Sequence, residues 1–158
     1  MSTRILAIDP GNEQSGYALV VDGAIQSAGV MVNSEILRLT TVSTPDVLAI
    51  EWIQSMGMAV GKEVFETCLW AGRFVQASGH VRTIRLVPRG ALKLHHCGSA
   101  RAKDPNIVQS LKDKYGDRGT KAKPGYFYGV SSHAWQAFAV AAYVMEGGTH
   151  DGEIKPIP

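Results

Sequence analysis

Two acidic residues interrupt short apolar runs of the chain, and they limit its fold more than any other feature. Asp9 closes the apolar run 5–8, directly before Pro10-Gly11, and Glu51 lies within the run 47–52. Both runs have the length and composition of buried strands, in which an unpaired carboxylate is costly. If the strands are neighbours that end at the same sheet edge, both carboxylates can share a cation, for which their oxygens favour Mg²⁺ or Mn²⁺. Each could instead be a structural acid with satisfied hydrogen bonds.

Other segments predict the rest of a sheet. Residues 16–21 and 24–32 favour strands, and Asp22-Gly23 between them readily forms a tight hairpin turn. Residues 83–87 predict a further strand that ends at Pro88. A meander of strands followed by strands that alternate with helices is typical of a mixed α/β domain in which helices cover a central sheet.

Two helices are predicted in the middle of the chain. Apolar residues of the segment 63–78 follow one helical face, and Gly79 marks its end. Asp104 is expected to cap a second helix, with Pro105 in its first turn and Gly116 as its terminator.

The last third of the chain predicts a loop and a final helix. Residues 116–129 are rich in Lys, Gly and Pro, which is typical of a loop. Ser131 or Ser132 is expected to cap the helix that follows, and this helix, which has one apolar face, is expected to end at Gly147-Gly148. We therefore expect one domain over residues 1–148 and a flexible C-terminal tail over residues 149–158.

The composition is that of a globular protein, with 45% hydrophobic and 19% charged residues among 158. The sequence has neither the pattern of a signal peptide nor an apolar run long enough to span a membrane. The two cysteines, Cys68 and Cys97, have no CxxC spacing, which favours a reducing cytoplasm. Cys97 could bind a metal together with His95 and His96, but a loop near a basic surface is the simpler interpretation.

Charge is distributed unevenly along the chain. Residues 73–123 carry twelve Lys or Arg against three acidic residues, a net charge of +9, whereas the remainder has a net charge of −7 and includes Asp9 and Glu51. A basic region can neutralise phosphates while an acidic centre holds divalent cations, as a nuclease requires. An ordinary solvated surface that happens to be basic is the alternative.

Several short motifs occur in an informative order along most of the chain. They are Ile8-Asp9-Pro10-Gly11 with Gly16-Tyr17-Ala18, Ile50-Glu51, Ala71-Gly72-Arg73-Phe74, Val87-Pro88-Arg89 with Lys93, Arg101-Ala102-Lys103-Asp104, and Ser132-His133-Ala134-Trp135-Gln136-Ala137-Phe138-Ala139-Val140-Ala141. This series resembles the RuvC family of Holliday-junction resolvases, including its phage-encoded members. The resemblance implies an RNase H-like fold, with a mixed central sheet flanked by helices, and the activity of a crossover junction endodeoxyribonuclease.

The resemblance also implies the active-site residues. Asp9, Glu51 and His133 would be the metal ligands, and these three together with Gln136 would be catalytic. Cellular members of the family carry an acid or His at the position of His133 and an Asp three residues later, where this chain has Gln136. That spacing places both side chains on one helical face. Phage members also lack the acid, so we interpret the departure as specific to a lineage, in which the amide oxygen binds weakly or holds a water.

The implied chemistry is phosphodiester hydrolysis with two Mg²⁺ or Mn²⁺ ions per active site, one to generate hydroxide and the other to stabilise the departing oxygen. Asp9 would bridge both ions, Glu51 would hold one, and His133 would orient or deprotonate the attacking water.

The implied partner is branched DNA, including Holliday junctions and forks, bound by a two-fold homodimer in the cytoplasm of a bacterial host if the protein is phage-encoded. Met56 and Met58 could wedge against unstacked bases at a branch point, with core or loop packing as the alternative. Phe65, Leu69 and Trp70 are spread too widely for one core stripe and could extend into the dimer interface. The basic residues assigned to DNA are Arg73, Arg89, Lys93, Arg101, Lys103, Lys121 and Lys123; all of them could alternatively be solvated.

Three other interpretations remain open from the sequence. An actin-like kinase fragment would share the Asp9-Pro10-Gly11 turn, but 158 residues leave no room for its second lobe. A DNA-binding module without catalysis would follow if Gln136 had abolished cleavage. An RNase H-like enzyme acting on RNA would use the same metal chemistry, because sugar discrimination requires separate contacts to the 2′-hydroxyl.

Overall fold

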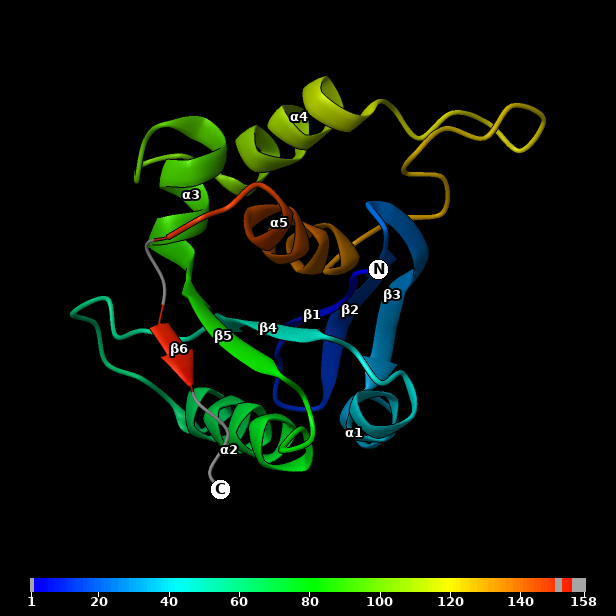
Figure 1. Cartoon of the computed structure of the whole chain (residues 1–158). Coiled ribbons are helices and arrows are strands. Elements are labelled where there is room, and N and C mark those ends of the chain that lie inside the picture. The colour runs from blue at the N-terminus through cyan, green and yellow to red at the C-terminus, as the bar shows by residue number, and fades with distance from the viewer. Residues whose placement is uncertain (1, 150–151, 155–158) are drawn as a thin grey trace.

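A computed structural model describes residues 2–149 and 152–154, which form a sheet in the order β3-β2-β1-β4-β5-β6 covered by helices (Figure 1). The strands are β1 (Arg4–Asp9), β2 (Gln14–Val21), β3 (Ala24–Val32), β4 (Val47–Trp52), β5 (Thr83–Pro88) and β6 (Gly152–Ile154). The helices are α1 (Asn33–Val42), α2 (Lys62–Ala77), α3 (Arg89–Cys97), α4 (Asp104–Tyr115) and α5 (Ala134–Met145).

The strand register brings the two interrupted apolar runs together. β1 pairs in parallel with β4, with Ile8 opposite Ile50, so the acidic residue that follows each isoleucine lies at the same edge of the sheet. β2 and β3 form the predicted hairpin, and both turn residues have positive φ angles, 51° at Asp22 and 80° at Gly23. These angles are those of a tight hairpin turn. The predicted sheet edge and the predicted hairpin are therefore confirmed.

Alternation along the strands divides the core into two layers. Ile5 and Ala7 of β1 pack in the cluster under α3, α4 and α5, whereas Leu6 and Ile8 pack in the cluster under α1 and α2 (Figure 1). Ala49 of β4 belongs to the first layer. Because side chains alternate, Asp9 and Glu51 continue the positions of Ala7 and Ala49 and project on the α5 side of the sheet.

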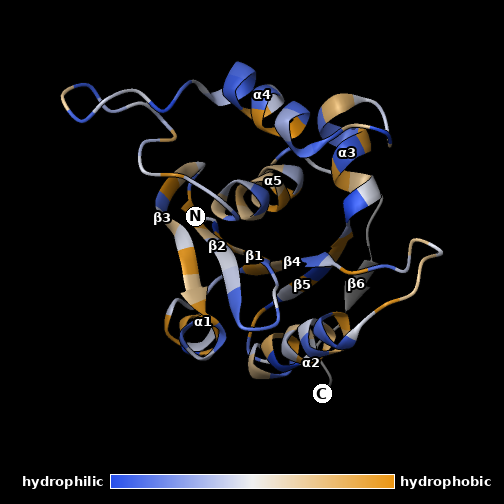
Figure 2. Cartoon of the chain, turned by 180° about the vertical axis from the view of Figure 1, so that it is seen from behind, coloured by the Kyte–Doolittle hydropathy of each residue, from blue (hydrophilic) through white to orange (hydrophobic). Residues whose placement is uncertain are grey.

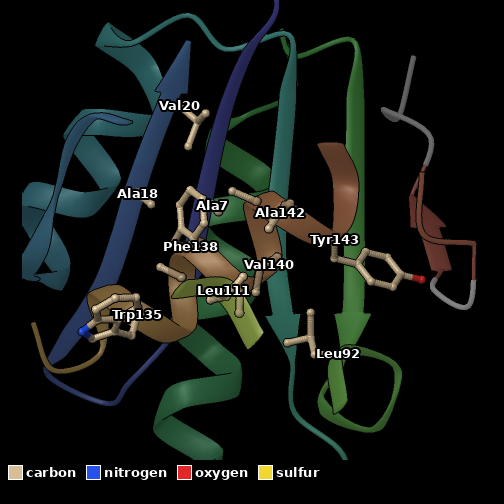
Figure 3. Packing of buried hydrophobic residues seen from close by; sticks show 14 of the residues in the cluster. Ala7, Ala18, Val20, Leu92, Leu111, Trp135, Phe138, Val140, Ala142 and Tyr143 are labelled. Carbon is tan, nitrogen blue, oxygen red and sulfur yellow. The ribbon is translucent and has the colours of Figure 1, made fainter. Parts of the chain in front are cut away.

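Small side chains let α5 lie close to the sheet. Ala7 and Ala18 face Phe138 and Ala142 across the layer (Figure 3). We expected one apolar face on this helix, but Ala134–Tyr143 is buried on all sides because α3 and α4 cover the face that points away from the sheet. Among the described residues, no helix is long and apolar enough to cross a membrane.

Two helix caps differ from the sequence prediction. The N-cap of α4 is Lys103, and the carboxylate of Asp104 instead bonds Arg89. Neither Ser131 nor Ser132 caps α5 through its side chain, since backbone turns from these residues lead into a helix whose N-cap is His133. The hydrogen bond of Asp104 with Arg89 takes the place of the first predicted cap. A tight turn, with Ser132 at a φ of 51°, takes the place of the second.

Two helices and one strand were not predicted. α1 follows β3 without a loop, and α3 contains the residues His95, His96 and Cys97 that we had placed in a loop. β6 lies in the segment expected to be a flexible tail and pairs antiparallel with β5, with Ile84 opposite Ile154. Backbone hydrogen bonds hold such a strand without requiring an apolar run. The remaining tail residues, 150–151 and 155–158, lie outside the described residues.

Candidate active site

Asp9 and His133 meet where β1 ends and α5 begins. His133 Nδ1 lies 2.9 Å from Asp9 Oδ2, with Asp9 largely buried and His133 exposed to solvent. The two residues are 124 positions apart in sequence, so only the packing of α5 on the sheet joins them. The histidine can therefore both hold the carboxylate and present its other ring nitrogen to solvent.

Gly16 makes this meeting possible. It lies opposite Asp9 in the β1–β2 register, and a Cβ atom at this position would lie 2.4 Å from the His133 carbonyl oxygen and 2.8 Å from its Cβ. No side chain fits at such distances, so glycine is required here for space. The strand and the first residues of the helix can approach only because position 16 carries no side chain.

Glu51 is held on the other side of the site by Arg89, which also bonds a second carboxylate. Arg89 donates a hydrogen bond of 2.8 Å to Glu51 Oε1 and also bonds Asp104. The second oxygen, Glu51 Oε2, is buried and has no hydrogen-bond partner among the residues that the structure describes. Arg89 therefore fixes the carboxylate while leaving one oxygen free for a further ligand.

The two buried carboxylates repel each other. Burial and the charge of the neighbouring Asp9, opposed by Arg89, together raise the pKa of Glu51 to about 7. Burial also raises the pKa of Asp9, although the hydrogen bond and charge of His133 oppose this shift. Arg89 and His133 thus compensate the pair only in part, and a cation would favour the ionised form of both.

The residues after Asp9 form one wall of a cleft. Residues Asp9, Pro10, Gly11, Asn12, Glu13, Gln14, Val30 and His133 line a cavity of about 380 Å³. The turn is fixed from behind by buried Asn33, which accepts a hydrogen bond of 2.6 Å from Ser15 and donates one of 2.8 Å to the Gly11 carbonyl. Ser15 and Asn33 therefore support the turn after Asp9. The sequence did not predict them, because they are 18 positions apart and meet only in the folded chain.

Gln136 lies on α5, three residues after His133. It is 8% exposed, and its Oε1 atom has no hydrogen-bond partner in the described part of the chain. Asp9, Glu51 and His133 therefore supply two carboxylates and an imidazole, and the free oxygen of Glu51 is buried without a partner among the described residues. Oxygen and imidazole donors fit a hard divalent cation such as Mg²⁺ or Mn²⁺.

A second cavity of about 300 Å³ lies beside Glu51. Its lining includes Arg89, Lys93, Trp52 and Met56. The loop 53–61 between β4 and α2 projects from the body and is hydrophobic along much of its length (Figure 2). Met56 and Met58 on this loop are 81% and 77% exposed, so packing in the core does not explain them.

The remaining basic residues assigned to DNA lie further apart. Arg73 stacks on Trp70 within α2, with its guanidinium carbon 4.1 Å from the ring centroid. Arg101 and Lys103 lie in the connection between α3 and α4. Lys121 and Lys123 lie in the long loop that projects beyond the end of α4 (Figure 1). The structure thus groups Arg89 and Lys93 with Glu51 and distributes the others over separate elements.

Comparisons with known proteins identify the fold. No family model matches the sequence, and no curated protein matches it. The chain is similar to the RuvC structure of Thermus thermophilus, with 15% identity and a TM-score of 0.69 over 98% of this chain and 100% of that one. It is also similar to T. thermophilus RuvC in complex with Holliday junction substrate, with 14% identity and a TM-score of 0.70 over 96% and 99% of the two chains. The chain therefore has a RuvC-like, RNase H-like α/β fold, as the sequence predicted.

The close approach at Gly16 leads to a first prediction. Gly16→Ala should lower the free energy of unfolding by about 1–3 kcal/mol, because its methyl group forces the start of α5 away from β2. Urea denaturation measures this difference. Gly72→Ala is the matched control, since outside the backbone of its own helix no atom lies within 4 Å of a Cβ there, and it should leave stability unchanged or raise it. Equal stability of wild type and Gly16→Ala would mean that the two elements can separate without cost.

The carboxylate repulsion leads to a second prediction. A carboxyl group whose pKa is raised on folding loses its stabilising contribution as the pH rises towards the folded value. Without divalent cations, Asp9→Asn should therefore stabilise the protein at pH 8, on the order of 1 kcal/mol, and lose this advantage at pH 5, where Glu51 is protonated.

Thermal unfolding in EDTA at the two pH values measures the effect. Asp113→Asn, on an exposed residue of α4, is the control and should change little at either pH. An Asp9→Asn protein that is less stable than wild type at pH 8 contradicts repulsion as the dominant interaction.

Proposed function

We propose that this protein is a divalent-metal-dependent endonuclease that cleaves Holliday junctions and other branched DNA. The observation that carries the proposal is the convergence of Asp9 and Glu51 from two parallel neighbouring strands with His133, the N-cap residue of α5. The RuvC-like fold over nearly the whole chain supports it, since one structural neighbour is a RuvC in complex with Holliday junction substrate.

In this proposal, Asp9 and Glu51 are the residues that hold Mg²⁺ or Mn²⁺, with His133 as a third ligand and two ions per site. When bound, such ions activate water and stabilise the leaving oxygen of a phosphodiester. His133 orients the attacking water or accepts its proton, because an imidazole exchanges protons near neutral pH. Arg89 keeps Glu51 oriented through Oε1 and lies close enough to offer positive charge to a phosphate.

The DNA would lie across the surface that joins the two cavities. Arg89 and Lys93 line the cavity beside Glu51, and Arg101 and Lys103 follow on the next connection. Arg73, Lys121 and Lys123 would contact phosphates further from the cleavage point. Met56 and Met58 are exposed on the loop 53–61, which follows β4 directly, and this supports their proposed role as wedges between unstacked bases.

Symmetric cleavage of a junction requires two active sites, and we propose a homodimer. Phe65 and Leu69 on α2 are each 65% exposed, an unusual state for side chains of this size. They lie four residues apart and so share one face of the helix. Two copies of this face, related by a two-fold axis, would bury these side chains and give the assembly the symmetry of its substrate.

The central prediction separates cleavage from binding. Asp9→Asn and Glu51→Gln should each reduce cleavage of a four-way junction by at least a hundredfold in Mg²⁺, because each removes a charged metal ligand. Affinity for the junction should change by less than about threefold, because the basic residues that neutralise phosphates are intact. Gel-shift and cleavage assays on four-way, fork and duplex DNA and on RNA measure both. Full cleavage by either variant would contradict the proposal, and selective cleavage of RNA would indicate the RNase H-like alternative.

A further prediction concerns the two polar residues at the start of α5. His133→Ala should reduce cleavage about a hundredfold, the scale of a positioned acid–base group, whereas Gln136→Ala should retain most of it. Single-turnover cleavage rates measure both, with junction affinity as the control for folding. If wild type is inert on every branched substrate and Gln136→Asp introduces cleavage, the protein is a DNA-binding module that has lost a metal ligand.

A further inference from the structure

A second group of potential metal ligands lies where α3 and α5 end, away from the carboxylates of the candidate active site. His95 and His96 lie in the last turn of α3, and Glu146 is the C-cap residue of α5. Each offers one ligand atom, and the three atoms lie within 4.8 Å of one another. His95 Nε2 is 3.4 Å from Glu146 Oε1. Ligands about 2 Å from a tetrahedral zinc ion lie about 3.3 Å apart, so small side-chain movements would close the group around an ion.

His96 is oriented as a metal-binding histidine would be. Its Nε2 lies 2.8 Å from the carbonyl oxygen of Ala139, and because a carbonyl only accepts, Nε2 carries the proton. In the neutral imidazole Nδ1 then carries a lone pair, and this atom is buried without a hydrogen-bond partner among the described residues. His96 is only 6% exposed, so water does not readily satisfy this atom. A backbone carbonyl that fixes one ring nitrogen while the other is free is the usual arrangement behind a metal-bound imidazole.

His95 has a similar unsatisfied nitrogen. Its Nε2 is buried without a hydrogen-bond partner within the described part of the chain, although it points towards Glu146. Edge contacts with Tyr143 and His96, at centroid distances of 5.0 and 4.9 Å, hold its ring in place. Two buried imidazole nitrogens thus lack partners beside one carboxylate.

The surrounding backbone favours a cation. Glu146 contacts Lys114 and Tyr115 at the end of α4, so the C-terminal ends of three helices, α3, α4 and α5, converge here. The C-terminal end of a helix carries partial negative charge. At present Lys114 Nζ supplies the positive charge, 2.6 Å from Glu146 Oε1. Lys114 is therefore the group with which a metal ion would compete.

We propose that His95, His96 and Glu146 form a binding site for a divalent transition metal of the zinc class, in which the ion takes the place of Lys114 beside Glu146. Two imidazole nitrogens and one carboxylate oxygen are ligands that select zinc-like ions over Mg²⁺. The ion fastens the end of α3 to the end of α5. Because α3 begins at Arg89, the residue that bonds Glu51, this site steadies the helix that supports the candidate active site.

The test uses the full chain and Co²⁺ as a spectroscopic substitute for Zn²⁺. The double variant Asp9→Asn/Glu51→Gln removes the carboxylate ligands of the other site. In that background, one equivalent of Co²⁺ should bind and show the intense visible absorption of four-coordinate Co²⁺, and Zn²⁺ should displace it. Adding His95→Ala or Glu146→Gln should weaken binding at least tenfold, whereas His80→Ala, at an exposed histidine, should not. Absence of one-equivalent binding, or equal affinity in all these variants, overturns the proposal.

Lys114→Met provides an independent arm that does not depend on removing a ligand. Because it removes the competing cation, it should tighten Zn²⁺ binding severalfold and increase the rise in Tm that Zn²⁺ produces. If Glu146 serves only Lys114 and Tyr115, the variant will lose stability and Zn²⁺ will not restore it, which contradicts a metal site. The readout is the shift caused by the metal, so a change in basal stability does not obscure it.

Discussion

The repulsion between two buried carboxylates is the interaction on which the rest of this structure depends. Parallel pairing of β1 with β4 places Asp9 and Glu51 at one sheet edge and on one face, and no rearrangement within the sheet can separate them without changing the register of both strands. His133 beside Asp9 and Arg89 beside Glu51 provide partial compensation, whereas the negative charge of Asp104 opposes it. The unpaired Oε2 of Glu51 shows that this compensation is incomplete among the described residues, and a divalent cation is the simplest complement.

Bringing α5 to this edge requires a sheet surface with small side chains. Ala7, Ala18 and Ala49 lie under the helix, and Gly16 admits the backbone of His133 at a distance that no side chain would allow. The cost is a helix buried on nearly all sides, which α3 and α4 must cover. The same two helices supply Arg89, which bonds Glu51, and Asp104, which bonds Arg89, so the covering layer also supplies charges around the site.

The elements predictable from sequence were those with local signals. Strand periodicity and the acidic interruptions at Asp9 and Glu51 predicted the sheet edge, and the family resemblance added His133. The short helix α3 was missed because its nine residues span few helical turns and its buried side includes a histidine, His96, beside Ala91 and Leu92. Asp104 was interpreted as a helix cap because its partner Arg89 lies fifteen residues earlier, and Ser15 and Asn33 met only through tertiary packing. Long-range polar pairing thus accounts for most of what the sequence did not predict.

Crystals of the protein soaked in Mn²⁺ and measured near the manganese absorption edge provide the most direct test of the central claim. The account predicts anomalous density within bonding distance of Asp9 and of Glu51 Oε2, and loss of that density in Glu51→Gln crystals treated in the same way. Manganese absent from this edge of the sheet at millimolar concentration, with the Asp9 and Glu51 carboxylates free of lattice contacts, would contradict it.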